Sequence, residues 1–425
     1  MVIGFAGLSH LGINSGIAIA SKGFDVIAYD QDAPLVDALN KKQLPIFEPG
    51  LEELLTKSAD RITFTSKLED LKKADVIYIS LDVSTDEKNT SDLTNLKKII
   101  SNVIEKADLN NRPQASLVVL SQVPPGFTRK LATSKFNLLY QVETLIFGRA
   151  VERALFPERY IVGCADPKKD LPPVYKKLLE NFNCPILPMR YESAELAKIS
   201  INMYLAASVT VTNTLAEICE KIGANWYEIS PSLKLDRRIG PHAYLAPGLG
   251  LSGGNIERDI ATIQNLSQEH GTQAHVADAF TSNSQYRKEW VLRTAHVETL
   301  SKHKDAMVAV WGLAYKQETK SIKNSPAVAL LEGMKGVNVQ IYDPQAVLPQ
   351  HLEGRTIKQT SNAIEACRNA HALLIMTPWS EFTKADLKQA KAVMKGKTVI
   401  DPHGMLDPKN CEELGFEYFK LGVNL

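Results

Sequence analysis

The stretch VIGFAGLSHLGINSGIAIASKGFDVIAYD, residues 2–30, decides the fold of the first part of the chain. An apolar run at 2–6 is followed by a glycine turn and by a segment rich in Ala, Ile and Ser at 13–22. A second apolar run then ends in Asp30. This pattern predicts a strand, a turn, a helix and a second strand, which is how a doubly wound sheet opens.

Further apolar runs occur at 76–79, 117–120 and 160–162, separated by stretches rich in Lys and Glu. Such alternation predicts a mainly parallel sheet with helices on both faces. We therefore expect residues 1–190 to form a dinucleotide-binding domain of the Rossmann type.

The pattern changes after this domain, because the chain runs from Ser193 to Gly223 without an internal proline or glycine and is apolar on most sides. One long buried helix is expected, with Ser193 as its N-cap and Gly223 as its C-terminal stop. A helical pattern also occupies 255–302, and no strand pattern is seen. Residues 191–303 are predicted to be a helical spacer or dimerisation domain.

A second alternating region begins near residue 304, with apolar runs at 307–311, 339–343, 372–376 and 398–401. It predicts a second, smaller doubly wound domain over residues 304–425. The expected fold class is thus α/β, with two Rossmann-like doubly wound domains joined by a long central helix and a helical dimerisation region.

The composition of the chain excludes several classes of partner and cofactor. Among 425 residues, 49 are Lys or Arg and 48 are Asp or Glu, so no global charge attracts nucleic acid or an anionic membrane. Five scattered cysteines form no CxxC pair, which indicates reduced thiols and no structural zinc or other metal. With no signal peptide recognised at Met1, a cytoplasmic protein without nucleic-acid or membrane partners is expected.

The first loop departs from the dinucleotide fingerprint in one position. Gly7 and Gly12 match its first and sixth glycines, but Ser9 stands at the third, where a side chain crowds the pyrophosphate. The next helix would still offer its N-terminus to an anion. Asp30 is placed to accept both ribose hydroxyls, which favours NAD over NADP. A βαβ unit that merely packs is the alternative.

Two other regions hold candidate site residues. In the long helix, Glu195, Lys198 and Asn202 share one stripe, so the lysine is a candidate for stabilising an alkoxide or for acting as a base. An ordinary Glu–Lys helix pair is the alternative. The segment 247–259 carries four glycines within seven residues, which lets a backbone lie close to a ligand, or forms a flexible surface loop.

Basic residues follow the strands of the second half. Lys316 and Lys323 lie in the segment after the run at 307–311, and such loops suit a phosphate-bearing ligand. The alternative is a solvated basic surface.

Taken together and in order, these segments resemble the UDP-glucose/GDP-mannose dehydrogenase family over nearly the whole chain. The motifs that carry the resemblance are EPGL at 48–51, AEL-x-K-x-x-x-N at 194–202, RIG at 238–240, the glycine-rich loop ending in Asp259, GLAYK at 312–316, YDP at 342–344 and TPWSEF at 377–382. The resemblance implies a dimeric, NAD-dependent enzyme that oxidises the C6 alcohol of a UDP- or GDP-sugar to a carboxylate with two NAD. It also associates the chain with polysaccharide biosynthesis.

The resemblance also implies roles for individual residues. The catalytic residues would be Lys198, Asn202, Asn255, Asp259 and, on a looser match, Glu143. The cofactor-binding residues would be Gly7, Ser9, Leu11, Gly12, Asp30, Val83 and Gln122. The substrate-binding residues would be Arg238 (across a homodimer interface), Tyr244, Gly250, Gly253, Lys316 and Lys323.

The departures from the family pattern occur at positions that the resemblance assigns to catalysis and cofactor binding. Val83 and Gln122 replace threonines, Phe147 replaces a glutamate, and Asn255 replaces the nucleophilic cysteine. The first hydride transfer needs a base, an oxyanion stabiliser and a cofactor. The second needs the aldehyde held as a tetrahedral adduct, which a thiolate forms and a carboxamide does not, because its nitrogen lone pair is delocalised.

Three hypotheses follow from these departures. The first is an NAD-dependent oxidoreductase that performs a single hydride transfer on a nucleotide sugar. The second is an acid-forming dehydrogenase that oxidises a hydrate. The third is a catalytically silent homologue that binds a nucleotide sugar.

Overall fold

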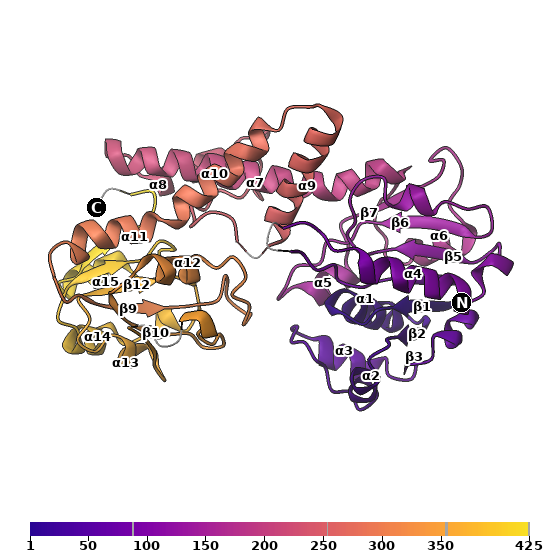
Figure 1. Cartoon of the computed structure of the whole chain (residues 1–425), viewed down its shortest axis with the longest axis horizontal. Helices are drawn as coiled ribbons and strands as arrows, with labels where there is room; N and C mark the ends of the chain where they lie inside the picture. Colours follow the sequence, from indigo (N-terminus) through magenta and orange to yellow (C-terminus); the bar gives the residue numbers. More distant parts are fainter. Residues whose placement is uncertain (87–88, 253, 353–355, 424–425) are drawn as a thin grey trace. The chain divides into compact units, whose positions relative to one another are not determined.

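The computed structural model describes residues 1–86, 89–252, 254–352 and 356–423 of the chain. It divides into two compact units, Met1–Ile201 and Asn202–Leu425. The two units share the long helix α7 (Tyr191–Ile222), which passes through the boundary (Figure 1).

The first unit is a doubly wound α/β sheet. Its strands are β1 (Val2–Ala6), β2 (Asp25–Tyr29), β3 (Ile62–Thr65), β4 (Val76–Ile79), β5 (Ser116–Val119), β6 (Asn137–Gln141), β7 (Tyr160–Cys164) and β8 (Ile186–Arg190). Its helices are α1 (His10–Ser21), α2 (Ala33–Asn40), α3 (Leu51–Lys57), α4 (Thr94–Lys106), α5 (Ala150–Leu155) and α6 (Pro173–Glu180), with short 3-10 helices at Leu68–Lys73, Leu109–Asn111 and Thr128–Leu131.

The strand order is β3-β2-β1-β4-β5-β6-β7-β8, and every neighbouring pair is parallel except β6 with β7. The order reverses between β1 and β4, so the carboxyl ends of these two strands mark the crevice where such sheets bind ligands. The expected strands are confirmed; β3, β6 and β8 are additional.

Alternate residues of each strand point to opposite faces, and each face has its own core. Phe5 and Tyr78 lie with α1, α2, α3 and α6 on one face. Ile77 and Val119 lie with α4 and the start of α7 on the other. Helices on both faces leave the strand ends as the place for a ligand.

The second unit contains a six-stranded parallel sheet of order β11-β10-β9-β12-β13-β14. The strands are β9 (Met307–Trp311), β10 (Asn338–Tyr342), β11 (Ile357–Gln359), β12 (Ala372–Ile375), β13 (Thr398–Ile400) and β14 (Glu417–Phe419). The helices are α8 (Trp226–Leu235), α9 (Asn255–His270), α10 (His275–Lys288), α11 (Trp290–Ala295), α12 (Pro326–Gly333), α13 (Ala363–Ala366), α14 (Leu387–Val393) and α15 (Pro408–Glu413), with short helical turns at His296–Leu300, Gln350–Leu352 and Phe382–Lys384. The four expected strands are confirmed, whereas β11 and β14 are additional.

Helix α7 begins two residues before the position expected from the sequence. Because the helix starts at Tyr191, Ser193 lies within its first turn, and the prediction that Ser193 is the N-cap is wrong. Gly223 follows the last residue, Ile222, with φ +76°, so the predicted stop is confirmed. Strand β8 leads directly into the helix at Arg190, which leaves no separate capping loop.

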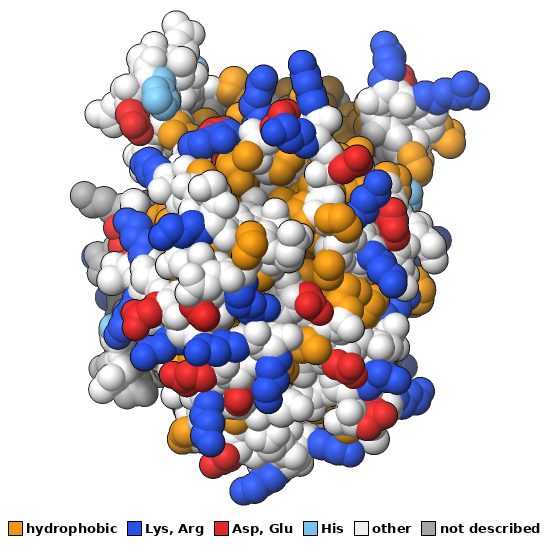
Figure 2. All heavy atoms as spheres, turned by 90° about the vertical axis from the view of Figure 1, so that its right-hand side faces the viewer, with side chains coloured by type: hydrophobic (Ala, Val, Ile, Leu, Met, Phe, Trp, Pro, Cys, Tyr) orange, Lys and Arg blue, Asp and Glu red, His pale blue; other side chains and the backbone are white. Residues whose placement is uncertain are grey.

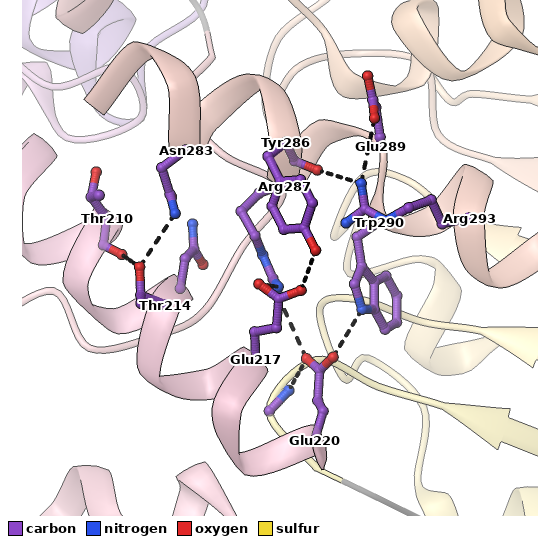
Figure 3. Close-up of polar contacts among 12 residues, drawn as sticks. Thr210, Thr214, Glu217, Glu220, Asn283, Tyr286, Arg287, Glu289, Trp290 and Arg293 are labelled. Atoms are coloured by element: carbon purple, nitrogen blue, oxygen red, sulfur yellow. Dashed lines mark hydrogen bonds and ion pairs between the residues drawn. The ribbon is translucent and has the colours of Figure 1, made fainter. Parts of the chain in front are cut away.

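A polar network fastens the end of α7 to α10 and α11 (Figure 3). The fully buried Arg287 lies 3.4 Å from a carboxylate oxygen of Glu217 and 3.6 Å from one of Glu220. Tyr286 donates to Glu217 over 2.6 Å, and the Trp290 indole donates to Glu220 over 3.1 Å. The network joins the helices that precede the second sheet.

Acidic and basic side chains are interspersed over the face shown in Figure 2, with apolar side chains between them. This agrees with the near-zero net charge of the chain. Within the described residues, no helix is long and apolar enough to cross a membrane. The five cysteines are free thiols.

Candidate active site

The loop between β1 and α1 has the geometry that a phosphate-binding turn requires. Gly7 has φ +101°, and a Cβ on Gly12 would lie 2.0 Å from the Gly7 carbonyl oxygen. Both positions therefore need glycine. The buried Leu11 anchors the first turn of α1 in the core, and the turn presents its amides at the switch point of the sheet.

Ser9 is fixed by the neighbouring strand. Its hydroxyl donates to the Ser80 carbonyl over 2.9 Å and accepts from the Asp82 amide over 3.1 Å. These bonds tie the glycine loop to the end of β4. The Ser9 hydroxyl is thus used within the protein, and the amides of α1 remain the anion-binding element.

Asp30 and Asp343 occupy equivalent places in the two sheets, but their carboxylates differ in how many further hydrogen bonds they can accept. One Asp30 oxygen accepts from the Leu8 amide over 2.7 Å and the other from Asp32 over 3.0 Å, and the side chain is half-buried. Asp343 is buried and accepts from the amides of Leu313, Ala314, Gln345 and Ala346 and from the indole of Trp379. Because a carboxylate has about four lone-pair sites, Asp30 retains capacity for ribose hydroxyls, whereas Asp343 is saturated.

Glu143 and Lys198 are electrostatically coupled in the first unit. Glu143 follows β6 and accepts from the Thr144 amide over 2.6 Å. Burial raises the pKa of Glu143, and the nearby charge of Lys198 partly opposes that rise. A half-buried carboxyl of raised pKa beside a cation is an arrangement typical of acid–base chemistry.

Glu195 belongs to the same stripe of α7 but has a structural role. It is fully buried, and its two oxygens accept from the amides of Gly126 (2.6 Å) and Thr128 (2.8 Å). Glu195 therefore holds the loop after β5, which also contains the half-buried Gln122. The alternative of a simple Glu195–Lys198 pair does not describe this contact.

In the second unit, Asn202 and Asp259 form a direct pair. Asn202 Nδ2 donates to Asp259 Oδ2 over 2.6 Å, and both residues are buried. Arg258 lies 3.5 Å from the other Asp259 oxygen. The contact joins α7 to the first turns of α9, where the glycine-rich segment ends.

Asn255 is the first residue of α9 and is exposed. Gly254 precedes it with φ +97°, and a Cβ there would lie 3.1 Å from Cε of Lys323. Glu257 closes this turn, because it accepts from the Gly254 amide (3.1 Å) and from the Asn324 side chain (3.2 Å). Asn255 and Lys323 thus border the same turn.

The remaining predicted substrate residues are dispersed. Gly250 has φ +77° and packs against the Ser284 carbonyl, so glycine there serves packing on α10. Tyr244 is half-exposed. Arg238 is highly exposed and paired with Asp236 over 2.6 Å. Gly253 lies outside the described residues.

Lys316, a predicted substrate residue, and Val83, a predicted cofactor residue, lie in segments that follow strands of the two sheets. The ammonium of Lys316 lies 5.7 Å from the ring centroid of Tyr315 in the segment after β9. Val83 is half-buried against the core of the first sheet, after β4.

One contact was missed by the sequence analysis. His10 Nε2 lies 2.7 Å from a Glu48 oxygen, and the His10 ring packs on Phe147 with centroids 4.2 Å apart. The three residues lie far apart in the sequence, at the start of α1 and in two loops, so no local spacing predicts the contact. The EPGL motif was the available signal, because it marked Glu48.

A doubly wound sheet with a glycine turn at its switch point, followed by an acid that can accept further hydrogen bonds, defines a dinucleotide-binding protein. The residues fit NAD, because the turn accommodates a pyrophosphate and Asp30 retains acceptor capacity. The particular family follows from comparison with known proteins.

Three domain profiles match the chain in order. Residues 1–183 match the NAD binding domain of the UDP-glucose/GDP-mannose dehydrogenase family, 192–285 its central domain and 309–408 its UDP binding domain. The chain belongs to the UDP-glucose/GDP-mannose dehydrogenase family. It is an oxidoreductase that uses NAD and acts on a nucleotide sugar.

Relatives and solved structures agree with this placement. The chain is 29% identical to a UDP-glucose 6-dehydrogenase of Rickettsia typhi over the full length of both chains. It is 30% identical to a putative UDP-glucose 6-dehydrogenase of Bacillus subtilis, with 98% of each chain covered. A UDP-D-ManNAc dehydrogenase of Pyrococcus horikoshii shares the fold with a TM-score of 0.85 at 23% identity, covering 100% of both chains. A UDP-glucose dehydrogenase of Pyrobaculum islandicum does so with a TM-score of 0.84 at 23% identity, covering 99% of this chain and 98% of that one.

Proposed function

We propose that this chain removes a single hydride from a CH–OH group of a nucleotide sugar and releases the carbonyl compound. NAD held at the turn between Gly7 and Gly12 would accept the hydride from the carbon, while a base of the protein takes the proton from the oxygen. No second oxidation to a carboxylate follows.

Two groups of side chains support the first transfer. Glu143, whose pKa burial raises, is proposed as the proton acceptor, and Lys198 as the cation that stabilises the developing alkoxide. Asn202 lies one helical turn after Lys198 on α7 and is oriented by Asp259. We assign Asn202 to a hydrogen bond with the reacting oxygen.

The observation that carries the proposal is the amide at the start of α9. Asn255 stands at the first helical position, exposed beside the Gly254 turn, where the family resemblance expects a cysteine. A carboxamide forms no covalent adduct with an aldehyde. The aldehyde or ketone is therefore the expected end product.

The cysteines of the second unit offer no substitute at this turn. Cys219 is buried with Ala216 and Trp226 near the end of α7. Cys367 and Cys411 are buried in the core of the second sheet, and burial raises the pKa of each thiol to about 12. Such thiols are neutral and unreactive at pH 7.

The test is to incubate purified protein with NAD and a panel of UDP- and GDP-sugars, and to follow NADH at 340 nm together with the sugar product by mass spectrometry. A carbonyl product and NADH are expected with at least one sugar. The variant Asn255→Cys is expected to gain the second oxidation and to form an acid. Absence of NADH and of any altered sugar across the panel contradicts the proposal.

A conventional acid-forming reaction through a hydrate has one observation in its favour. Glu143 is a half-buried carboxyl with raised pKa, so it could also activate a water molecule that adds to the aldehyde. An acid formed by the unaltered protein identifies this route. A catalytically silent homologue is less well supported. The Ser9 hydroxyl is bonded to Ser80 and Asp82, so the amides of α1 remain for the pyrophosphate of the cofactor.

We also propose a homodimer built on α7, and a reducing cytoplasmic location. Large apolar side chains of α7 are exposed, namely Tyr204, Val211, Leu215, Ile218 and Ile222. Exposed apolar stripes of this kind mark protein–protein contacts. Light scattering after size exclusion tests the dimer: a monomer at micromolar concentration contradicts it.

A further inference from the structure

His10 has an environment unlike that of an ordinary surface histidine. It is the first residue of α1 and is largely enclosed, with 12% of its side chain exposed. Its Nε2 lies 2.7 Å from Glu48 Oε1, and Phe147 covers the ring at 4.2 Å. The ring is thus fixed on two sides.

Glu48 is itself firmly held. Its side chain is fully buried, and its oxygens accept from the amides of Gly148 (2.9 and 3.1 Å) and Ala150 (3.2 Å). Because both Glu48 oxygens accept from backbone amides, the ring nitrogen that faces Glu48, His10 Nε2, is the donor of their hydrogen bond. Glu48 therefore sets the tautomer and the orientation of the imidazole.

The remaining nitrogen, Nδ1, makes no hydrogen bond to any described residue of the chain. His10 stands in the first turn of α1, whose amides and dipole favour an anion. A phosphate oxygen is an acceptor, so a bond from Nδ1 requires a hydrogen on Nδ1 as well. The carboxylate of Glu48, bonded to Nε2, is the counter-charge for a ring that donates from both nitrogens.

We propose that His10 binds the pyrophosphate of NAD as an imidazolium oriented by Glu48, and that cofactor binding takes up a proton at His10. The inference rests on the proposed cofactor site in the first unit and adds a side chain from within the glycine motif to the backbone amides that the motif supplies. No covalent bond changes; one proton moves from solvent to Nδ1.

The charges around the ring are consistent with this role. Glu48, from the loop before α3, is the carboxylate bonded to it. Phe147 and, one turn further along α1, Asn14 are neutral. Arg149, beyond Phe147, is ion-paired with Glu152 over 2.7 Å. On the β4 side, Asp82 bonds through its amide to Ser9. One histidine and one bonded carboxylate thus form the unit that gains the proton.

The experiment is titration calorimetry of the whole protein at pH 8 with NAD, ADP-ribose and AMP, in two buffers of different ionisation enthalpy. Histidine side chains are mostly neutral at this pH, so proton uptake is measurable. The variant His10→Gln keeps a neutral donor for Glu48. His10→Lys restores a cation. His351→Gln is the matched control, because His351 pairs with Glu332 over 3.0 Å on the exposed surface of the second unit.

The wild type is expected to take up protons with NAD and ADP-ribose. His10→Gln should lose that uptake and bind both about tenfold more weakly, equivalent to about 1.4 kcal/mol. Affinity for AMP, which lacks the pyrophosphate, should not change, and His10→Lys should recover part of the lost affinity.

Unchanged affinity and proton uptake in His10→Gln overturn the inference while leaving the cofactor site intact. Equal weakening of AMP without recovery in His10→Lys also overturns it, because the effect is then structural. A wild type that binds neither NAD nor ADP-ribose removes the cofactor site and this inference together.

Discussion

Asn202 donates from Nδ2 to Oδ2 of Asp259 over 2.6 Å, and both side chains are buried. Asp259 lies one helical turn after Asn255 in α9. The pair therefore fixes the start of α9 against α7 and, with it, the position of the amide that we hold responsible for a single oxidation.

Replacing Asp259 by alanine should lower kcat by about 10²- to 10³-fold, because Asn202 loses the partner that aims it. The Asn202 amide is then buried and unpaired, so the free energy of unfolding should fall by about 1–3 kcal/mol. Steady-state kinetics and denaturant unfolding measure the two effects. The control is Asn283→Ala, which removes an exposed bond to Thr214 on the same helix α7. Equal loss of activity in both variants contradicts the role of Asp259.

Two glycines of α1 give a matched pair for the cofactor site. A Cβ on Gly12 would lie 2.0 Å from the Gly7 carbonyl, whereas one on Gly16 would meet the Phe5 ring at an ordinary 3.5 Å. Gly12→Ala should weaken NAD binding at least tenfold. Gly16→Ala should leave it unchanged and add up to about 1 kcal/mol of stability from helix propensity. Calorimetry checks both, and wild-type NAD affinity in Gly12→Ala would show that the loop does not hold the cofactor.

The sequence predicted the strands that carry long apolar runs, because burial on both faces leaves an unmistakable pattern. It missed β6, whose run Asn137–Gln141 starts and ends in polar residues, and so could not place Glu143 at a strand end. It also placed the start of α7 at Ser193, since a capping residue is the usual signal. Here a strand feeds the helix directly.

The sequence predicted those residues of the candidate site that helical spacing or the family resemblance marks, but it did not predict their contacts. The stripe of α7 was predictable from helical geometry, but spacing cannot tell that Glu195 binds the amides of Gly126 and Thr128. The pairs His10–Glu48 and Asn202–Asp259 join residues 38 and 57 positions apart. Contacts of that kind are set by tertiary packing and leave no local pattern.

The raised pKa of Glu143 predicts a pH-dependent effect on stability. Burial makes the folded pKa higher than the unfolded one, so the contribution of Glu143 is favourable at low pH and is lost as the pH rises through the folded pKa. Glu143→Gln should therefore match the wild type near pH 4 and gain stability relative to it toward pH 8. Thermal unfolding across this range measures the difference. A difference that does not vary with pH contradicts a raised pKa of Glu143 in the folded protein.

The network around Arg287 predicts a large effect on stability. Arg287→Met leaves Glu217 and Glu220 without their buried cation, at an expected cost of about 3–5 kcal/mol. Arg293→Met is the control, since Arg293 pairs with Glu289 at the surface and should cost about 0.5 kcal/mol. Chemical denaturation checks both. Similar costs for the two variants would mean that the buried ion pairs contribute little.

The central claim is that oxidation ends after one hydride because residue 255 is an amide. Its most direct measurement is the ratio of NADH formed to nucleotide sugar consumed at completion, with the product identified by mass spectrometry. The account predicts a ratio of one with a carbonyl product for the wild type. A ratio of two with a uronic acid would contradict it.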